Sequence, residues 1–319
     1  MEKKEILSVE HLTKQYVKGV SAVDDISFSL TEGEVFGLLG PNGSGKTTTI
    51  LMLLGLLEPT SGAVSVLGCD PFRKPLSVKR QVAYMPDDIG FYDTMSAYGN
   101  VDYTARFLGL DADERKKRIE EAFDAVRLTD RMHDKARTFS HGMKRRLGLA
   151  EILVKQPKIA ILDEPTQGLD PQSTSEFLQM IRTLKEQKGM TFLISSHQLD
   201  EVQSVCDRVG LFSQGKLIGY GSLDELSRRY FGPDKLVEVQ VDGDKDLLPV
   251  FSAIQGVGKV ERKDASHWVL QCATDLRAKV SQAVFASGEN LMSLSLLYHS
   301  LGDIYQHAFE EVSHEEQGT

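Results

Sequence analysis

One segment near the N-terminus restricts the possible folds of this chain more than any other. Residues 40–47 read Gly-Pro-Asn-Gly-Ser-Gly-Lys-Thr, which matches the pattern Gly-x-x-x-x-Gly-Lys-Thr. An apolar run at residues 35–39 precedes the pattern, and a largely apolar stretch at residues 48–54 follows it. This context predicts a buried strand, a tight loop and a helix, in that order.

The chemistry of this loop suits the phosphate groups of a nucleotide. Glycines let backbone N–H groups turn toward phosphate oxygens, and the beginning of a helix adds a partial positive charge. Lys46 adds a full charge, and the hydroxyl of Thr47 can ligate Mg²⁺. The alternative, an ordinary glycine-rich turn at a helix start, would require the whole pattern to arise by chance. The expected nucleotide-binding residues of this segment are Gly40, Pro41, Asn42, Gly43, Ser44, Gly45, Lys46, Thr47 and Thr48.

A pair of carboxylates forms the second part of the predicted site. Four apolar residues, 159–162, are followed directly by Asp163 and Glu164. A buried strand would deliver both side chains to its C-terminal edge, where open parallel sheets bind ligands. Asp163 is expected to hold Mg²⁺, directly or through water, and Glu164 to polarise the water that attacks the γ-phosphate. The alternative is a strand that ends at an ordinary acidic turn.

Three further elements point to the same edge. Ser140 and Gly142 begin a helical run and can form a second anion site, although Ser140 also suits simple helix capping. Asp170 follows Glu164 closely in the chain. His197 ends another apolar strand, where it could meet a γ-phosphate; an isolated histidine in such a place usually has a structural role.

Length and composition set wider limits. The chain has 319 residues, which suggests about two domains. Its net charge of −9 argues against a nucleic-acid binder whose whole surface is basic, and leaves a local basic patch open. The three cysteines are scattered, so neither a disulfide framework nor a metal ribbon is expected. The N-terminus lacks a signal peptide, and the apolar block at residues 50–57 is far shorter than the ~20 residues that span a bilayer. We expect a soluble, cytoplasmic chain that needs another polypeptide for any membrane process.

The order of predicted elements indicates an α/β fold with two domains. Short strands at residues 5–39 predict an antiparallel portion, and alternating strands and helices after the loop, which begin with a helix at residues 45–57, predict a mostly parallel sheet. A charged helical insertion forms a subdomain at about residues 95–155. A first domain should cover residues 1–229. A second, at residues 234–312, has the order β-α-β-β-α-β of a split-βαβ, ferredoxin-like domain, with dimerisation or regulation as its expected role.

These motifs resemble the nucleotide-binding subunit of an ABC transporter, and the resemblance covers about residues 5–225. Residues 40–47 resemble Walker A, residues 159–164 Walker B, and residues 140–144 the signature motif. Residues 168–171 resemble the D-loop. The resemblance also implies that His197 is the switch histidine and that Tyr16 stacks on adenine; alone, Tyr16 could be a partly buried surface aromatic.

The chain departs from the family pattern at two places. The usual signature Leu-Ser-Gly-Gly-Gln is Phe-Ser-His-Gly-Met at residues 139–143, so Met143 cannot donate the glutamine's side-chain hydrogen bond. Asp87 stands at the position of the Q-loop glutamine; it can still ligate Mg²⁺ or water but adds a charge. Both variants resemble those of bacterial subfamilies that export drugs, antibiotics, lipids or ions through separate membrane subunits.

The resemblance implies a mechanism and partners. Two ATPase subunits would pack head to tail, as a homodimer or with a paralogue, and each ATP with Mg²⁺ would lie between one Walker A and the partner's signature. Hydrolysis by Glu164, His197 and Lys46 would power export through a polytopic permease, with this subunit on the inner face of the membrane. The alternative is a soluble ABC ATPase that acts on nucleic acid or ribosomes. The single cassette and the missing cysteine clusters count against it.

Overall fold

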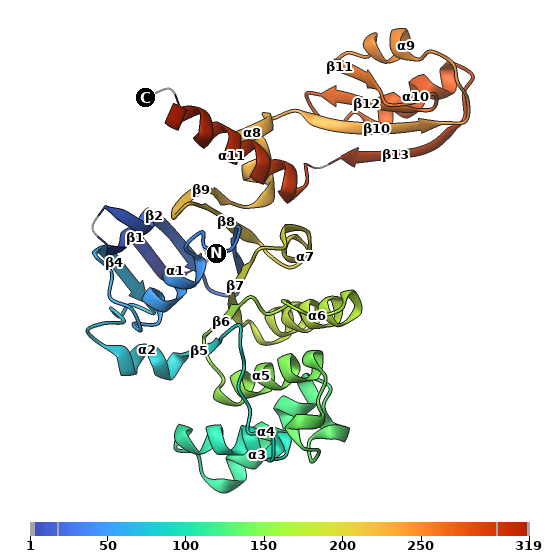
Figure 1. The fold of residues 1–319 in the computed structure, drawn as a ribbon. Helices are drawn as coiled ribbons and strands as arrows, with labels where there is room; N and C mark the ends of the chain where they lie inside the picture. The colour runs from blue at the N-terminus through green and yellow to red at the C-terminus, as the bar shows by residue number, and fades with distance from the viewer. Residues whose placement is uncertain (1–3, 18, 298, 318–319) are drawn as a thin grey trace. The chain divides into compact units, whose positions relative to one another are not determined.

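The computed structural model describes residues 4–17, 19–297 and 299–317, and the chain divides into two compact units. The first unit is Met1–Ser222 and the second is Leu223–Thr319. Each unit is described separately below, with the labels of Figure 1. Within the described residues, no helix combines the length and the apolar character needed to cross a membrane.

A six-stranded sheet forms the centre of the first unit. Its strands follow the order β5-β6-β7-β3-β8-β9, with parallel neighbours except for the antiparallel pair β8–β9. Every residue of β3, β6 and β7 is buried, as expected for parallel strands covered on both faces. The strands are β3 (Val35–Leu39), β5 (Val82–Met85), β6 (Ile159–Asp163), β7 (Thr191–Ser196), β8 (Arg208–Ser213) and β9 (Lys216–Gly221).

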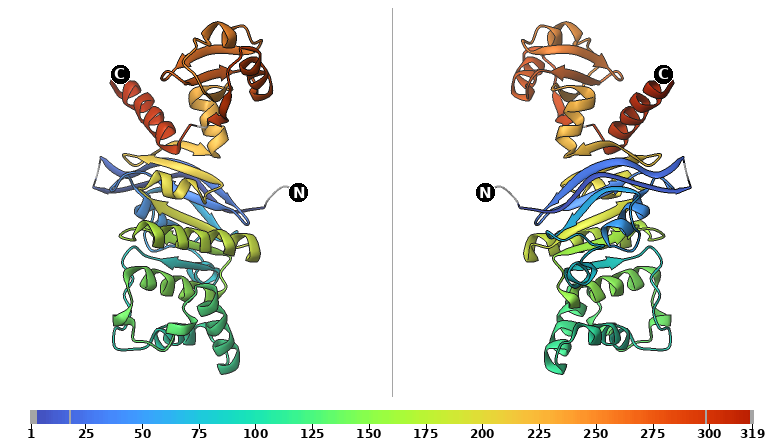
Figure 2. Two further views of the ribbon diagram at one scale, coloured as in Figure 1. Left: turned by 90° about the vertical axis from the view of Figure 1, so that its right-hand side faces the viewer. Right: turned by 90° about the vertical axis from the view of Figure 1, so that its left-hand side faces the viewer.

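A three-stranded antiparallel sheet, in the order β2-β1-β4, adjoins the central sheet. It comprises β1 (Glu5–Val17), β2 (Val20–Thr31) and β4 (Ser61–Val66), shown in blue in Figures 1 and 2. Its inward side chains share a core with residues of the central strands, such as Phe36 and Ile161. The predicted antiparallel portion near the N-terminus is therefore confirmed.

Helices of the first unit cover the central sheet and build a helical subdomain (Figures 1 and 2). Helix α5 contacts strand β5 and also both α3 and α4, so it joins the sheet to the helical insertion. The helix expected at residues 45–57 ends earlier, at Leu53, because Gly55 adopts φ +64°. The elements are α1 (Lys46–Leu53), α2 (Pro75–Gln81), α3 (Ala97–Ala105), η1 (Arg106–Leu108), α4 (Ala112–Ala125), η2 (Thr129–Arg131), η3 (Ala136–Thr138), α5 (His141–Lys155), α6 (Pro171–Lys188) and α7 (Leu199–Gln203).

The second unit contains a four-stranded antiparallel sheet with the strand order β11-β12-β10-β13. The chain passes through it as β-α-β-β-α-β, and its own core is built around Trp268 and Phe251, whose rings meet edge to face. Its elements are α8 (Leu223–Phe231), β10 (Lys235–Val241), α9 (Leu248–Ser252), β11 (Val257–Arg262), β12 (His267–Cys272), α10 (Arg277–Ala286), β13 (Leu291–Leu297) and α11 (Leu301–Gln317).

The division between the units lies earlier than the boundary expected at residues 229–234. Helix α8 belongs to the second unit because it packs on α11, where the ring of Phe231 meets that of His307 edge to face at 4.6 Å between centroids. Phe231 also stacks on His299, just before α11, at 3.6 Å between centroids. The predicted fold class, an α/β ATPase core followed by a small α+β domain, is confirmed.

Candidate active site

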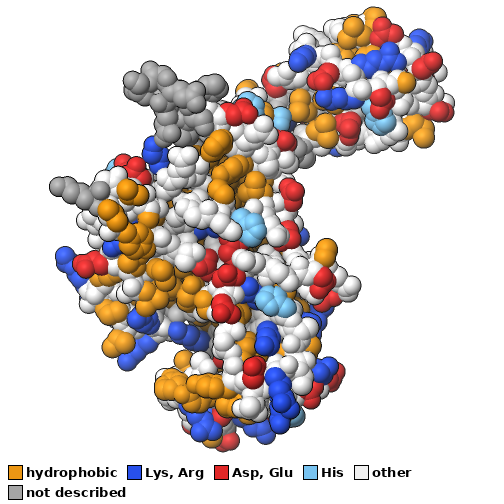
Figure 3. All heavy atoms as spheres, viewed as in Figure 1, with side chains coloured by type: hydrophobic (Ala, Val, Ile, Leu, Met, Phe, Trp, Pro, Cys, Tyr) orange, Lys and Arg blue, Asp and Glu red, His pale blue; other side chains and the backbone are white. Residues whose placement is uncertain are grey.

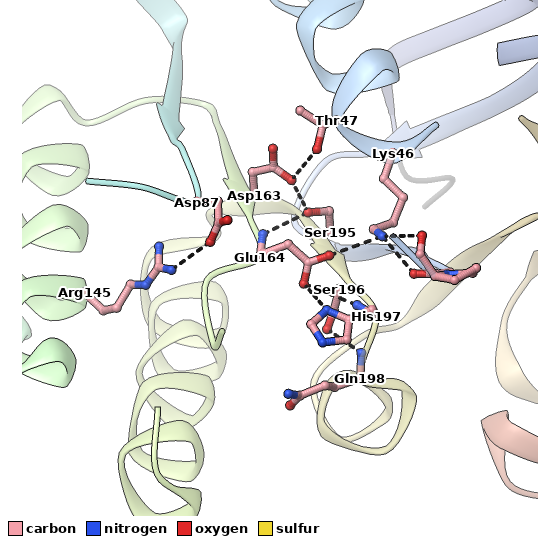
Figure 4. A network of polar contacts seen from close by, with 12 residues as sticks. Lys46, Thr47, Asp87, Arg145, Asp163, Glu164, Ser195, Ser196, His197 and Gln198 are labelled. Carbon is pink, nitrogen blue, oxygen red and sulfur yellow. Dashed lines mark hydrogen bonds and ion pairs between the residues drawn. The ribbon is translucent and has the colours of Figure 1, made fainter. Parts of the chain in front are cut away.

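The glycine-rich loop connects β3 to α1 and lies at the C-terminal edge of the central sheet (Figure 4). Gly45 adopts φ +108° and precedes the first turn of α1, whose N-terminus has no side-chain cap among the described residues. The N-termini of α3, α4, α5 and α6 are each capped by a serine or aspartate, whereas α2 and α7 resemble α1 in having no side-chain cap among the described residues. The backbone N–H groups at the start of α1 therefore remain available for an anion.

Lys46 turns back over this loop and is 5% exposed. Its Nζ donates hydrogen bonds to the carbonyls of Gly40 (2.8 Å) and Pro41 (3.1 Å). The same nitrogen lies 3.2 Å from Oε1 of Glu164. The site thus places its cation directly against the carboxylate that sequence analysis assigns to water activation (Figure 4).

Asp163 ends strand β6 with a buried carboxylate that three hydroxyl groups approach. Ser195 Oγ donates to Oδ1, Thr47 Oγ1 lies 3.3 Å from Oδ1, and Tyr84 OH lies 3.5 Å from Oδ2. Burial and then the negative charge of Asp163 raise the pKa of Tyr84 to about 12, so this phenol keeps its proton. The predicted proximity of Thr47 and Asp163 is present in the structure.

Glu164 follows with a backbone conformation that is unusual for a residue with a side chain. Its φ is +46°, and its N–H donates to Ser195 Oγ at 2.9 Å. Its Oε2 accepts from Nδ1 of His197 at 2.8 Å and from the His197 N–H at 3.3 Å. Because a carboxylate can only accept, Nδ1 of His197 carries the proton of this hydrogen bond. Nε2 of His197 takes no part in the contact with Glu164.

A pocket brings together much of the predicted site. Asp87 reaches it from the loop after β5, where its Oδ1 accepts from the buried Arg145 of α5 at 3.1 Å. The pocket is lined by Ala22, Asn42, Gly43, Gly45, Lys46, Thr47, Thr48, Asp87, Glu164 and Gln167.

Within the glycine-rich loop, Gly40, Pro41 and Ser44 are not part of this pocket lining, and neither are Asp163 and His197. Four predicted binding residues outside that loop are also absent from the lining. Tyr16 is 61% exposed on β1, with Lys14 Nζ 5.6 Å from its ring centroid. Ser140 Oγ caps α5 by accepting from the Met143 N–H. Asp170 caps α6, and hydrogen bonds from Ser173 lower the pKa of its carboxyl group.

The last of these four residues, Gly142, packs beside that cap. A Cβ added to it would lie 3.2 Å from the Ser173 hydroxyl. The start of α5 therefore adjoins the start of α6. Neither helix start lines the pocket that contains Lys46.

Sequence analysis missed several residues of the site. Ser195 and Tyr84 contact Asp163, Arg145 anchors Asp87, and Ala22 and Gln167 line the pocket. A polar residue inside the apolar run of β7 was the one available signal for Ser195. Tyr84 lies on β5, so its contact with Asp163 depends on the strand order that brings β5 beside β6.

The residues present fit a nucleoside triphosphate with Mg²⁺. Ser44 Oγ is buried and has no hydrogen-bond partner within the described part of the chain, the start of α1 is uncapped, and Lys46 supplies a buried cation. No group of three or more described His, Cys, Asp or Glu side chains forms a metal site by itself. Thr47 and Asp163 nevertheless suit Mg²⁺, because this ion commonly binds to one or two protein oxygens together with substrate phosphates.

The parallel sheet, the phosphate loop and the paired carboxylates define a P-loop ATPase. A family model for ABC transporters matches residues 23–167. The chain is 38% identical over 282 residues to the linearmycin resistance ATP-binding protein LnrL of Bacillus subtilis, covering 88% of both chains. It is 38% identical to the bacitracin transport ATP-binding protein BcrA of Bacillus licheniformis, covering 70% of this chain and 72% of BcrA.

A solved structure leads to the same family. CbiO1 of Clostridium perfringens, part of the ABC transporter complex CbiONQ, matches with a TM-score of 0.66 and 30% identity, over 70% of this chain and 91% of CbiO1. This chain belongs to the ATP-binding subunits of ABC transporters. It binds ATP with Mg²⁺ and hydrolyses it to drive transport.

Proposed function

We propose that this chain powers the export of antimicrobial compounds through a separate permease, as an ATP-dependent homodimer on the inner face of the cell membrane. The relatives named for linearmycin resistance and bacitracin transport support the class of cargo. A paralogue could replace the second copy of the chain without changing the chemistry described below.

One observation carries the proposed dimer. Ser140 is exposed at the start of α5, and Ser140, Gly142 and Asp170 do not line the pocket that contains Lys46. A helix start with an exposed hydroxyl suits a phosphate group that a second chain presents. Head-to-tail packing would supply these residues to the partner's pocket and complete two equal sites.

Within each pocket, we assign the grip on the triphosphate to the loop and Lys46. The uncapped N–H groups of α1 and the Lys46 ammonium would face the negative oxygens, while Thr47, Asp163 and Asp87 would hold Mg²⁺ directly or through water. When bound, Mg²⁺ supplies positive charge that neutralises the phosphate oxygens. Tyr16, exposed on β1, would stack on the adenine ring.

Glu164 and His197 would carry out the proton chemistry. Glu164 must release Lys46 to polarise a water molecule, and its other oxygen remains fixed by the two hydrogen bonds from His197. Held this way, the carboxylate keeps one orientation, and His197 would stand beside the γ-phosphate of a bound nucleotide.

The helical subdomain would transmit the motion to the permease. Arg145 ties the Asp87 loop to α5, the helix that begins with the signature residues. Apolar side chains gather on the exposed surface of this subdomain (Figure 3), where the rings of Tyr92, Tyr103 and Phe107 form successive edge-to-face contacts. Such a surface suits a cytoplasmic segment of a membrane partner.

The decisive experiment replaces Glu164 with Gln. Glu164→Gln keeps the shape and loses the charge, so we expect ATP affinity within about threefold of wild type, an ATP-dependent dimer in gel filtration, and turnover lowered at least about 100-fold. Glu121→Gln, at an exposed position on α4, serves as the matched control. Wild-type turnover in Glu164→Gln would contradict the assigned role.

The cargo requires a separate test in cells. A strain that lacks this gene should gain sensitivity to some members of a panel of antimicrobial compounds, and wild type but not Glu164→Gln should restore resistance. Affinity purification from membranes should recover a polytopic protein with this chain. An RNA-stimulated ATPase without a membrane partner would favour the soluble alternative.

A further inference from the structure

One buried polar side chain beside the carboxylates has no part in the roles assigned above. Ser195 is 0% exposed and lies in β7, a strand whose residues are all buried. Parallel pairing of β6 with β7 places Ser195 directly beside Asp163. A hydroxyl in such a place must be hydrogen-bonded or pay a desolvation cost.

The directions of its two hydrogen bonds are fixed by chemistry. The Glu164 N–H can only donate, so Ser195 Oγ is the acceptor at 2.9 Å. An ionised carboxylate can only accept, so the single hydroxyl proton of Ser195 goes to Asp163 Oδ1. One oxygen atom therefore joins the side chain of the first carboxylate to the backbone of the second (Figure 4).

The joined backbone is strained. Glu164 has φ +46°, a region that residues with a Cβ seldom adopt, and such conformations persist only where the surroundings enforce them. Ser195 holds the Glu164 N–H, and His197, two residues further along, holds the Glu164 side chain. Ser195 in β7 and His197 just after β7 therefore hydrogen-bond to the backbone N–H and to the carboxylate of Glu164, respectively.

We propose that Ser195 is a positioning residue for ATP hydrolysis. Its hydroxyl fixes the Asp163 carboxylate and the Glu164 turn relative to each other, so that the Mg²⁺-holding and water-polarising groups act from one constant geometry. This inference rests on the proposed roles of those two carboxylates. It assigns to Ser195 an effect on the chemical step rather than on nucleotide affinity.

Kinetics provide the first test. In Ser195→Ala, kcat should fall at least about tenfold while the Kd for ATP stays within about threefold, and Ser195→Thr should recover most of the loss because it keeps the hydroxyl. Thr191→Val is the matched control: Thr191 is equally buried at the other end of β7, where its hydroxyl accepts from the Gly33 N–H at 2.9 Å. It should keep kcat within about twofold of wild type.

Hydrogen exchange in the nucleotide-free protein provides a readout that is independent of activity. In Ser195→Ala, the Glu164 amide should exchange at least about tenfold faster, followed by mass spectrometry of overlapping peptides across residues 159–167. Thr191→Val should leave this amide unchanged. If Ser195→Ala does not fold, Ser195→Cys takes its place, because a thiol is only a weak donor and acceptor.

The possible results distinguish a failure of the positioning role of Ser195 from a failure of the proposed role of Glu164. Wild-type kcat and wild-type exchange in Ser195→Ala would overturn the positioning role, as would an equal loss of kcat in Thr191→Val. A Ser195→Thr protein that melts like wild type yet is as inactive as Ser195→Ala would also overturn it. Wild-type turnover in Glu164→Gln would instead remove the proposed role of Glu164 itself.

Discussion

All three glycines of the phosphate loop have positive φ angles, and two of them, Gly43 and Gly45, have very different surroundings. Gly43 has φ +80° with open space at its Cβ position, whereas Gly45 has φ +108° and an added Cβ would lie 2.6 Å from the carbonyl oxygen of Ala22. Backbone strain alone acts at Gly43, while strain and a clash with backbone act together at Gly45. The two positions therefore separate these effects within one loop.

We expect Gly43→Ala to lower the free energy of unfolding by about 1 kcal/mol and Gly45→Ala by at least about 2–3 kcal/mol. Denaturant unfolding followed by fluorescence, analysed for the first transition, would measure both. Equal losses in the two variants would show that the contact with Ala22 relaxes at little cost.

Individual site residues were predictable only where a contiguous motif contains them. Lys46, Thr47, Asp163 and Glu164 lie in short segments whose order along the chain already indicates their chemistry. Ser195 could not be assigned in this way, because its contacts depend on the register that pairs it with Asp163 across two strands. A shift of one residue would turn its hydroxyl to the other face of the sheet.

At the scale of elements, the long periodic helices followed from the sequence, as did the short strands β3 and β6, which lead directly into motifs. Several short elements without a motif did not. Sequence analysis did not assign α2, β5, β8, β9 or α8, which have four to nine residues each. Segments of this length carry too few periods to identify a helix or a strand. Tertiary contacts decide them, as for β5, which pairs with β6 along its whole length.

The packing of α3 on α5 leads to a prediction about pH. Glu151 of α5 accepts from Thr104 Oγ1 at 2.9 Å, and burial raises its pKa from 4.5 to about 6. Between these two values the folded protein binds more protons than the unfolded chain, so stability from this group is lost as pH rises through the window. Above pH about 6, Glu151 carries a negative charge in the folded protein, and burial of this charge lowers the stability.

Glu151→Gln should therefore raise the free energy of unfolding by about 1 kcal/mol at pH ~8, and the difference should vanish below pH ~4.5. Glu121→Gln, exposed on α4, should change little at either pH. Thermal unfolding measured across this range would test the expectation. A benefit that grows toward acid pH would contradict the assigned direction of the pKa shift.

At the scale of the whole molecule, each unit has its own core. The two hydrophobic clusters of the first unit lie between Ile6 and Tyr220, and the cluster of the second lies between Val237 and Leu296. The nucleotide pocket draws on the first unit alone. We propose that the second unit contributes to the dimer instead.

Deletion of residues 223–319 should leave the ATP affinity within about twofold of the full chain and weaken ATP-dependent dimerisation at least about fivefold. Analytical ultracentrifugation of both chains, each carrying Glu164→Gln to prevent turnover, would measure the change. Lys259→Gln, at an exposed position on β11, gives a control that alters the second unit without removing it. Dimers of unchanged strength would exclude this role for the C-terminal domain.

The ion pair between Lys46 and Glu164 has a consequence for selectivity. An incoming anion must take the lysine from a carboxylate that already neutralises it within 3.2 Å. Free orthophosphate or sulfate brings no base or sugar contacts to offset that exchange, whereas a nucleotide does. We therefore expect the abundant inorganic anions of a cell to compete weakly, so that occupancy follows the supply of nucleotide rather than of salt.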